Sequence, residues 1–176
     1  MVNLVAADRN APRRASGICE RRTEVALDER WACLYEEFRP ALYRAAALMV
    51  GAADAEEVVQ ETFERAMRER DFFKRVREPK AWLRTVAARR AFGRLRRRRV
   101  FERLRLRPAA DRIEPWERVD LAAALARLAS RERVAVVLRY YADASYEEIA
   151  GAVGMPASSV GPLLTRARSR LREHLC

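Results

Sequence analysis

Ten arginines and one acid, Glu102, lie between Arg89 and Arg107, so this segment has a local charge of +9. A guanidinium presents a planar fork of donors that matches the oxygens of a phosphate. Neutralised phosphates release counterions, so such a segment is expected to bind DNA with a steep dependence on salt. A solvated basic helix without a partner, or one lying on anionic lipid, is the alternative explanation.

Three aromatic residues, Phe72, Phe73 and Trp82, come shortly before this basic run. Aromatic rings beside a cationic track stack on unpaired bases, with about 1–3 kcal/mol for each base. The alternative is a place in the core, and Trp82 lies on a predicted apolar stripe. Phe72 and Phe73 are adjacent and point in different directions, so one helix face cannot bury both.

Acidic residues gather on the exposed side of a predicted helix that precedes the basic run in the sequence. Its members are Asp54, Glu56, Glu57, Gln60, Glu61 and Glu64. In a chain of net charge +11, an acidic face suits a basic protein surface better than it suits DNA. Paired carboxylates also occur at metal and acid–base sites, but the lack of nearby histidine favours protein binding.

Residues 145–171 have the layout of a helix-turn-helix, a motif whose second helix enters the DNA major groove. Ser145 and Glu148 have the spacing of a capping box, and Gly154 suits the end of a short first helix. On the second helix Val160, Leu164, Ala167 and Leu171 share the inner face. The positions left for DNA are Ser158, Ser159, Gly161, Pro162, Thr165, Arg166 and Ser169. An ordinary helical hairpin within a bundle is the alternative.

The composition argues against several chemistries. The chain has 176 residues with one histidine, His174, and three dispersed cysteines, Cys19, Cys33 and Cys176. Two-histidine metal sites and histidine triads are therefore excluded, and no CxxC pair suggests zinc. Six scattered glycines form no phosphate-binding loop. We expect no enzyme activity, no metal and no cofactor.

The overall charge and hydropathy favour a soluble protein with a polyanionic partner. The 36 basic residues, of which only Lys74 and Lys80 are lysines, exceed the 25 acidic ones, and the pI is about 10.6. No apolar run approaches the ~20 residues that a membrane helix needs, and no signal peptide follows Met1. We expect a cytoplasmic protein without membrane insertion.

The apolar periodicity predicts helices in the first half of the chain. Residues 1–26 show no sustained period and are expected to form a mobile basic tail. A helical stripe starts at Leu27, and Pro40 is expected to bend or break that helix. A second helix should begin near Asp54 with a capping box to Glu57. Its expected inner stripe is Ala55, Val58, Val59, Phe63 and Met67.

A third helix is predicted from Pro79 to the Arg96–Arg99 run. The period fades over 101–116, which contains Pro108 and is expected to be a linker. More helices follow, one of them after a possible cap at Ser130. We predict an all-α fold with two small helical domains, 27–100 and 117–176, of which the second contains the helix-turn-helix.

Three segments occur in an order and spacing that resemble one family. They are Asp54–Phe63, Ala81–Leu83, and Tyr146–Ala150 together with Arg166–Leu171. The chain resembles the bacterial extracytoplasmic-function sigma factors, small members of the sigma-70 family. The resemblance covers about 27–175, with the tail and linker unmatched.

The resemblance implies a role for each region. Residues 27–100 would be sigma region 2, which binds core RNA polymerase and the −10 promoter element, and 117–176 would be region 4. The implied contacts with the clamp of the largest polymerase subunit are Asp54, Glu56, Glu57, Gln60, Glu61 and Phe63. The implied −10 contacts, which would read and open the DNA, are Phe72, Phe73, Lys80, Trp82, Arg84, Arg89, Arg90, Arg94 and Arg97. The implied −35 contacts are Ser158, Ser159, Gly161, Pro162, Thr165, Arg166, Arg168 and Ser169. Region 4 would also meet the polymerase flap, and an anti-sigma factor is an expected partner.

This sequence differs from the family pattern at two places, and these differences limit which roles the resemblance implies. Many relatives have Asn where this chain has Arg89, so the base preference at −10 does not carry over. Relatives often have a Lys-Ser-Arg-like run where this chain has Gly161-Pro162-Leu163. Proline inside a helix costs about 3 kcal/mol or more unless it lies in the first turn. We therefore expect the recognition helix to start late, near Ser158, or to kink at Pro162, and to read the −35 element unusually or weakly.

Two other functions compete. An autonomous helix-turn-helix repressor would explain the last region and the charge, but not the acidic helix or the aromatic segment. A non-initiating, sigma-like decoy would bind polymerase without starting transcription.

Overall fold

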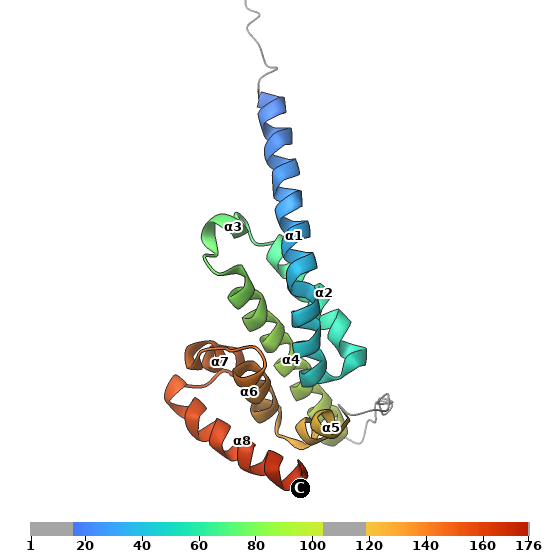
Figure 1. The fold of residues 1–176 in the computed structure, drawn as a ribbon, viewed down its shortest axis with the longest axis vertical. Helices are drawn as coiled ribbons and strands as arrows, with labels where there is room; N and C mark the ends of the chain where they lie inside the picture. The colour runs from blue at the N-terminus through green and yellow to red at the C-terminus, as the bar shows by residue number, and fades with distance from the viewer. Residues whose placement is uncertain (1–15, 104–118, 176) are drawn as a thin grey trace, which may run out of the picture. The chain divides into compact units, whose positions relative to one another are not determined.

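The computed structural model of the chain describes residues 16–103 and 119–175, and every regular element in these ranges is helical (Figure 1). The all-α prediction is therefore confirmed. The α-helices are α1 (Ser16–Val50), α2 (Ala52–Met67), α3 (Phe72–Arg75), α4 (Pro79–Arg103), α5 (Val119–Arg127), α6 (Ser130–Tyr140), α7 (Tyr146–Val153) and α8 (Val160–Leu175). A 3₁₀ turn, η1 (Ala157–Ser159), precedes α8.

The chain divides into two compact units, residues 1–37 and 38–176. Helix α1 begins at Ser16, so the expectation of an irregular tail up to residue 26 is wrong for 16–26, and 1–15 lie outside the described residues. The helix also continues through Pro40, where we predicted a bend or break. Pro40 is exposed, whereas Phe38 and Leu42 beside it are buried, and their burial compensates for the lost backbone hydrogen bond.

Helix α2 begins two residues before the predicted cap. Its N-cap is Gly51, whose φ of 94° is readily adopted only by glycine, and no side chain caps this end. The capping box from Asp54 to Glu57 is therefore absent, since Asp54 already lies in the first turn. The stripe is buried as predicted from Ala55 to Phe63, but Met67 is 64% exposed at the last position of the helix.

Helix α4 is central to the second unit and packs against α2, α6 and α7. It starts at Pro79 as predicted and ends at Arg103, three residues into the expected linker. Leu83, Ala88 and Ala91 are fully buried, and the small alanine side chains allow neighbouring helices to approach closely. Residues 104–116 of the expected linker lie outside the described residues.

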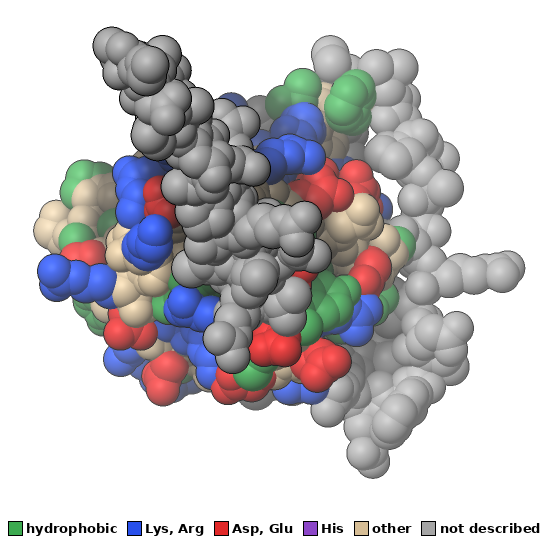
Figure 2. Space-filling view, turned by 90° about the horizontal axis from the view of Figure 1, so that it is seen from above, with side chains coloured by type: hydrophobic (Ala, Val, Ile, Leu, Met, Phe, Trp, Pro, Cys, Tyr) green, Lys and Arg blue, Asp and Glu red, His purple; other side chains and the backbone are tan. Residues whose placement is uncertain are grey.

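The last helices share a core around Leu128, Val134, Ile149 and Val160, each with no exposed side-chain surface. The sequence predicts a possible cap at Ser130, and this prediction is wrong. Ser130 is the first residue of α6, and it is buried. No helix in the described ranges is both long and apolar enough to span a membrane. Seen from above, basic and acidic side chains are interspersed over the surface (Figure 2).

Candidate polymerase and nucleic-acid interface

Three ion pairs between α2 and α4 join residues that the sequence analysis placed on two different interfaces. The guanidinium of Arg94 donates hydrogen bonds at 2.8 Å to Glu57 and at 2.8 Å to Glu61. Arg90 donates to the second carboxylate oxygen of Glu61 at 2.6 Å. The expected polymerase-binding acids and DNA-binding arginines therefore partly neutralise one another.

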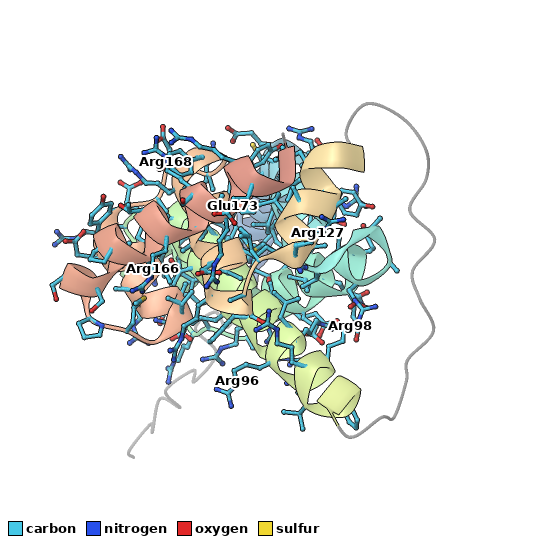
Figure 3. The ribbon with its side chains drawn as sticks, turned by 90° about the horizontal axis from the view of Figure 1, so that it is seen from below. Arg96, Arg98, Arg127, Arg166, Arg168 and Glu173 are labelled. Carbon is cyan, nitrogen blue, oxygen red and sulfur yellow. The ribbon has the colours of Figure 1, made fainter. Side chains whose placement is uncertain are left out.

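A fourth pair, Arg98 with Asp54 at 4.0 Å, continues this row toward the start of α2. We call these four pairs the α2–α4 ion-pair row. Figure 3 shows Arg98 on the α2 side of α4 and Arg96 on another side, away from α2. Arg96 and Arg97 are exposed, so the arginines of α4 divide into one set that faces α2 and another that faces solvent.

The ion-pair row changes the acid–base behaviour of its members. The hydrogen bond from Arg94, together with its positive charge, lowers the pKa of Glu57 below the usual 4.5. The hydrogen bond to Glu57 in turn raises the pKa of Arg94, with the charges of Glu61, Glu57 and Asp54 acting in the same direction. Arg94 is only 16% exposed at its side chain, so its charge is directed mainly at α2.

A second stripe of α2 faces solvent. Glu56 pairs with Arg39 at 2.7 Å, and Gln60 donates to Glu64 at 3.1 Å. Glu56 and Gln60 are exposed, whereas Phe63 is only 5% exposed. Phe63 is therefore a core residue and not a surface contact, which corrects its expected role. We call Glu56, Gln60 and Glu64 the outer α2 stripe.

The aromatic residues after α2 form one cluster. The ring of Phe72 packs edge-to-face against Phe73, with centroids 5.3 Å apart, and against Trp82 at 5.2 Å. Phe72 is 3% exposed, so it is packed inside and is not available to stack on a base, contrary to its expected role. Phe73 and Trp82 are partly exposed. As expected from their adjacency, Phe72 and Phe73 are not both buried.

The remaining basic residues of the expected −10 surface follow α4. Lys80 is partly exposed near the start of the helix. Arg84 lies 3.7 Å from Glu148, and Arg89 donates through Nε to the backbone oxygen of Gly151 at 3.0 Å. Both partners belong to α7, so part of this surface is in contact with the helix-turn-helix.

A shallow hollow of about 340 Å³ lies between α2 and α4. Its lining residues are Glu61, Arg65, Val86, Arg89, Arg90, Gly93 and Arg97. A Cβ on Gly93 would make only an ordinary contact, with the Arg97 side chain at 3.8 Å. Four of the seven lining residues are arginines, one of which, Arg90, is paired with Glu61, so the lining carries a net positive charge.

The helix-turn-helix forms as predicted. The Ser145 hydroxyl accepts from the N–H of Glu148 at 3.2 Å, and the Ser145 N–H donates to the Glu148 carboxylate at 2.7 Å. Gly154 closes α7 in the left-handed region with φ 65°. The turn η1 ends at Ser159 and α8 begins at Val160, close to the expected late start.

Pro162 lies in the first turn of α8, where its missing N–H removes no intrahelical hydrogen bond. A kink at Pro162 is therefore not needed. Neither the partly exposed Gly161 nor the exposed Pro162 carries a side-chain donor in this turn. The hydroxyl of Thr165, one turn later, donates to the Gly161 carbonyl at 3.1 Å.

The outer face of α8 contains the remaining expected −35 residues. Ser158, Pro162, Thr165 and Ser169 are exposed and follow one another at helical spacing. Arg166 and Arg168, two positions apart and both exposed, point to different sides of α8 (Figure 3). They therefore flank the exposed Pro162–Thr165 face on its two sides.

A buried carboxylate fixes α8 to the rest of the helix-turn-helix. Glu132 is 4% exposed, accepts from the N–H of Ala129 at 3.0 Å and receives Arg170 of α8 at 2.8 Å on both oxygens. Sequence reasoning placed Arg170 in a family motif but missed Glu132. Its only signal was an acid in the first turn of α6.

Two family models match the two halves of the site. Sigma-70 region 2 matches residues 34–100, which contain α2, α3 and most of α4, and Sigma-70 region 4 matches 118–171, which contain α5–α7 and most of α8. The chain belongs to the sigma-70 family, in its extracytoplasmic-function group. The order of the acidic helix, the arginine-rich helix and the helix-turn-helix is the order of these regions.

Similar sequences are sigma factors of Streptomyces. The chain is 46% identical over 59 residues to RNA polymerase sigma-E factor of Streptomyces antibioticus and equally to that of Streptomyces coelicolor. These matches cover 34% of this chain and 33% of each relative, so the chain spans only about a third of the relatives' length.

Similar solved structures cover much more of this sigma-70 family member. The sigma factor RpoE in complex with the anti-sigma factor NepR from Bartonella quintana matches with a TM-score of 0.70 and 26% identity, over 84% of this chain and 97% of that one. CnrH in complex with the cytosolic domain of CnrY matches with a TM-score of 0.61 and 27% identity, over 84% and 88%.

The structure also contains links between regions 2 and 4 that sequence reasoning missed. Arg99 donates to the carbonyl of Leu128 at 3.1 Å, and Arg133 donates to that of Met49 at 3.0 Å. Such bonds have no sequence signal, because a backbone carbonyl accepts from any donor that the fold brings near.

Proposed function

We propose that this chain is an alternative sigma factor that binds core RNA polymerase, recognises −10 and −35 promoter DNA and promotes strand opening. The observation that carries the proposal is the juxtaposition of an acidic α2 and an arginine-rich α4 in the region 2 match. A helix-turn-helix in the region 4 match accompanies them. The polymerase carries out catalysis, and this chain recognises the promoter. It acts in the cytoplasm without a metal or a cofactor.

The outer α2 stripe is the proposed docking surface for the clamp of the largest polymerase subunit. Its acids, Glu56 and Glu64, are 51% and 43% exposed at their side chains and pair with Arg39 and Arg68, whereas Glu57 and Glu61 are engaged with α4. Complementary charge steers such a surface toward a basic partner. In this proposal Asp54, Glu57 and Glu61 orient α2 on α4, and the outer stripe makes the intermolecular contact.

The proposed −10 surface combines the aromatic cluster with the basic hollow. Phe73 and Trp82 are partly exposed and suited to stack on unpaired bases, while Phe72 supports them from inside. Arg97 and its neighbours around the hollow bind the phosphates of the same strand. Stacking holds bases only after they leave the duplex, so this surface traps the melted strand.

The proposed −35 surface is the outer face of α8, whose first turns would lie in the major groove. Arg166 and Arg168 would contact phosphates on its two sides. The other helices of region 4 would meet the polymerase flap, and an anti-sigma factor is a proposed regulator. Two structures similar to this chain are complexes, the first of them with an anti-sigma factor.

The experiment is reconstitution with bacterial core polymerase. Run-off transcription from a promoter library, with permanganate footprinting of melted thymines, should give specific transcripts and melting near −10. Polymerase binding without melting would indicate a decoy, and no polymerase binding would leave an autonomous repressor.

A matched pair of variants tests the docking surface. Glu56→Lys and Glu173→Lys make the same charge change at exposed positions on α2 and α8. Only Glu56→Lys should weaken binding to core polymerase. Equal loss in the two variants would show that overall charge, and not the outer α2 stripe, determines binding.

A further inference from the structure

A second cavity, of about 420 Å³, lies between the last turns of α4 and the start of α6, and we call it the α4–α6 cavity. It shares no lining residue with the basic hollow between α2 and α4. The side formed by α4 consists of Phe92, Arg96, Arg99 and Val100. Pockets of about 300–1,000 Å³ commonly hold small molecules, so the α4–α6 cavity is large enough for one.

The N-terminus of α6 opens onto this cavity. Ala129, which precedes the helix, and its first two residues, Ser130 and Arg131, form the second side of the lining. The first N–H groups of an α-helix have no acceptor within the helix, and the helix dipole adds partial positive charge there. This end of the cavity therefore favours a negatively charged group.

A buried hydroxyl group lies at the same point without a partner. Ser130 is only 6% exposed, and its side chain makes no hydrogen bond to any residue in the part of the chain that the structure describes. Burial of a hydroxyl group without a hydrogen bond is unfavourable. A ligand in the cavity that accepts a hydrogen bond from Ser130 would remove this cost and gain affinity.

Three arginines of the lining add full positive charges. Arg96, Arg99 and Arg131 form no ion pair with any acidic side chain in the described ranges. Arg99 donates to the Leu128 carbonyl at 3.1 Å, and Arg96 and Arg131 are exposed. A guanidinium donates two parallel hydrogen bonds to a phosphate, so these side chains suit a phosphate group next to Ser130.

The rest of the lining is apolar. Phe92 lies under the guanidinium of Arg131, 5.9 Å from ring centroid to Cζ, and Val100 is 55% exposed. An inorganic anion would leave Phe92, Val100 and Ala129 facing water. A ligand that also carries an apolar ring would cover these side chains and gain the free energy of their burial.

We propose that the α4–α6 cavity binds a small phosphate monoester that carries an apolar ring. Its phosphate accepts hydrogen bonds from Ser130, from the N-terminus of α6 and from the nearby arginines, and its ring packs against Phe92 and Val100. A nucleic-acid strand on this surface would reach the exposed arginines, but the buried hydroxyl favours a ligand small enough to enter the cavity. The inference goes beyond the proposed function and does not depend on it.

The experiment is isothermal titration calorimetry on the full chain without polymerase. The probe is phenyl phosphate, and inorganic phosphate and phenol represent its two halves. Phenyl phosphate should bind at one site, roughly tenfold or more tightly than either half, because only the ester has both groups that the lining fits. Equal affinity for phenyl phosphate and either half would overturn the proposed ligand class.

Two variants test the residues of the site. Ser130→Ala removes the hydroxyl group and should remain folded, since this hydroxyl group has no partner to lose and alanine suits a helix. Its affinity for phenyl phosphate should fall about tenfold, as expected for a hydrogen bond to a charged group. Arg131→Met should cause a loss of about the same size. The matched controls are Ser169→Ala and Arg168→Met, at exposed positions of α8, and both should bind like the wild type.

The overturning results are equally specific. Wild-type affinity in folded Ser130→Ala and Arg131→Met would show that the cavity is not the site, and circular dichroism checks the fold. Equal losses in the α8 controls would show that phenyl phosphate responds only to the net charge of the chain. Displacement of phenyl phosphate by a single strand of about 12 nucleotides, with the same loss of strand affinity in Ser130→Ala, would assign the cavity to nucleic acid instead.

Discussion

Arg94 of α4 donates a hydrogen bond to Glu57 of α2 at 2.8 Å, and the same guanidinium reaches Glu61 at 2.8 Å. Two helices of opposite charge are thereby joined side by side. The link separates arginines that stabilise the fold from those, such as Arg97, that face solvent. The outer α2 stripe takes no part in this link, because its acids pair with Arg39 and Arg68.

Removing the Arg94 charge should destabilise the fold more than removing an exposed arginine of the same helix. Arg94→Met leaves Glu57 without its charge-assisted donor and Glu61 with Arg90 alone, so we expect a loss of about 1 kcal/mol in the free energy of unfolding. Arg97→Met should change that free energy by less than about 0.5 kcal/mol. Denaturant unfolding followed by circular dichroism measures both variants. Equal losses would contradict a structural role for the ion-pair row.

Binding to single-stranded DNA should show the reverse order. Arg97→Met removes an exposed charge at the basic hollow, so it should weaken binding and reduce the slope of log affinity against log salt by about 0.7. Arg94→Met should leave that slope nearly unchanged, since its charge is already directed at α2. A salt titration by anisotropy measures both slopes. Equal slopes for these two variants would contradict the division of the α4 arginines.

The lowered pKa of Glu57 predicts a pH dependence of stability. The folded pKa lies below the usual 4.5, so the stabilisation is present above about pH 4.5 and is lost as the pH falls through the lowered folded value. Glu57→Gln should therefore show a smaller fall in melting temperature between neutral pH and pH 3 than the wild type. Thermal melts across this range test the prediction, and parallel curves for the two proteins would exclude it.

The Glu132–Arg170 pair should stabilise region 4. Arg170→Met leaves a nearly buried carboxylate with only the Ala129 N–H as a donor, and we expect a loss of about 2–3 kcal/mol in the free energy of unfolding. Arg168→Met removes an exposed arginine two positions away and serves as the control, with little expected change. Chemical denaturation measures the difference. A loss below about 0.5 kcal/mol for Arg170→Met would show that Glu132 does not depend on this partner.

The first turn of α8 should limit recognition of the −35 element. Gly161→Lys combined with Pro162→Ser supplies donors on this exposed face, so duplex −35 affinity should rise and the salt slope should increase by about 1. Pro162→Ala alone should change stability by less than about 0.5 kcal/mol, since Pro162 costs no hydrogen bond there. Unchanged affinity and −35 preference in the double variant would refute weak readout by this turn.

The sequence by itself determined the helical class, the helix-turn-helix and the places where charge gathers. These features depend on local rules. Apolar residues at helical spacing identify the buried side of α8, and Ser145, Glu148 and Gly154 determine the limits of α7 through bonds and angles within a few residues. The family motifs depend on the same local strings, which is why the regions could be assigned before the fold was seen.

Only the tertiary structure decided which of these charged side chains form contacts between helices and which face solvent. Glu57 and Arg94 are 37 positions apart, and Arg89 and Gly151 are 62 apart, so no periodicity or motif pairs them. The burial of Phe72 and the continuation of α1 through Pro40 likewise depend on long-range packing that outweighs local propensity. Charge patterns identified the binding surfaces, but three-dimensional packing selected the side chains available to bind, because ion pairs and burial depend on distance in space and not on distance along the chain.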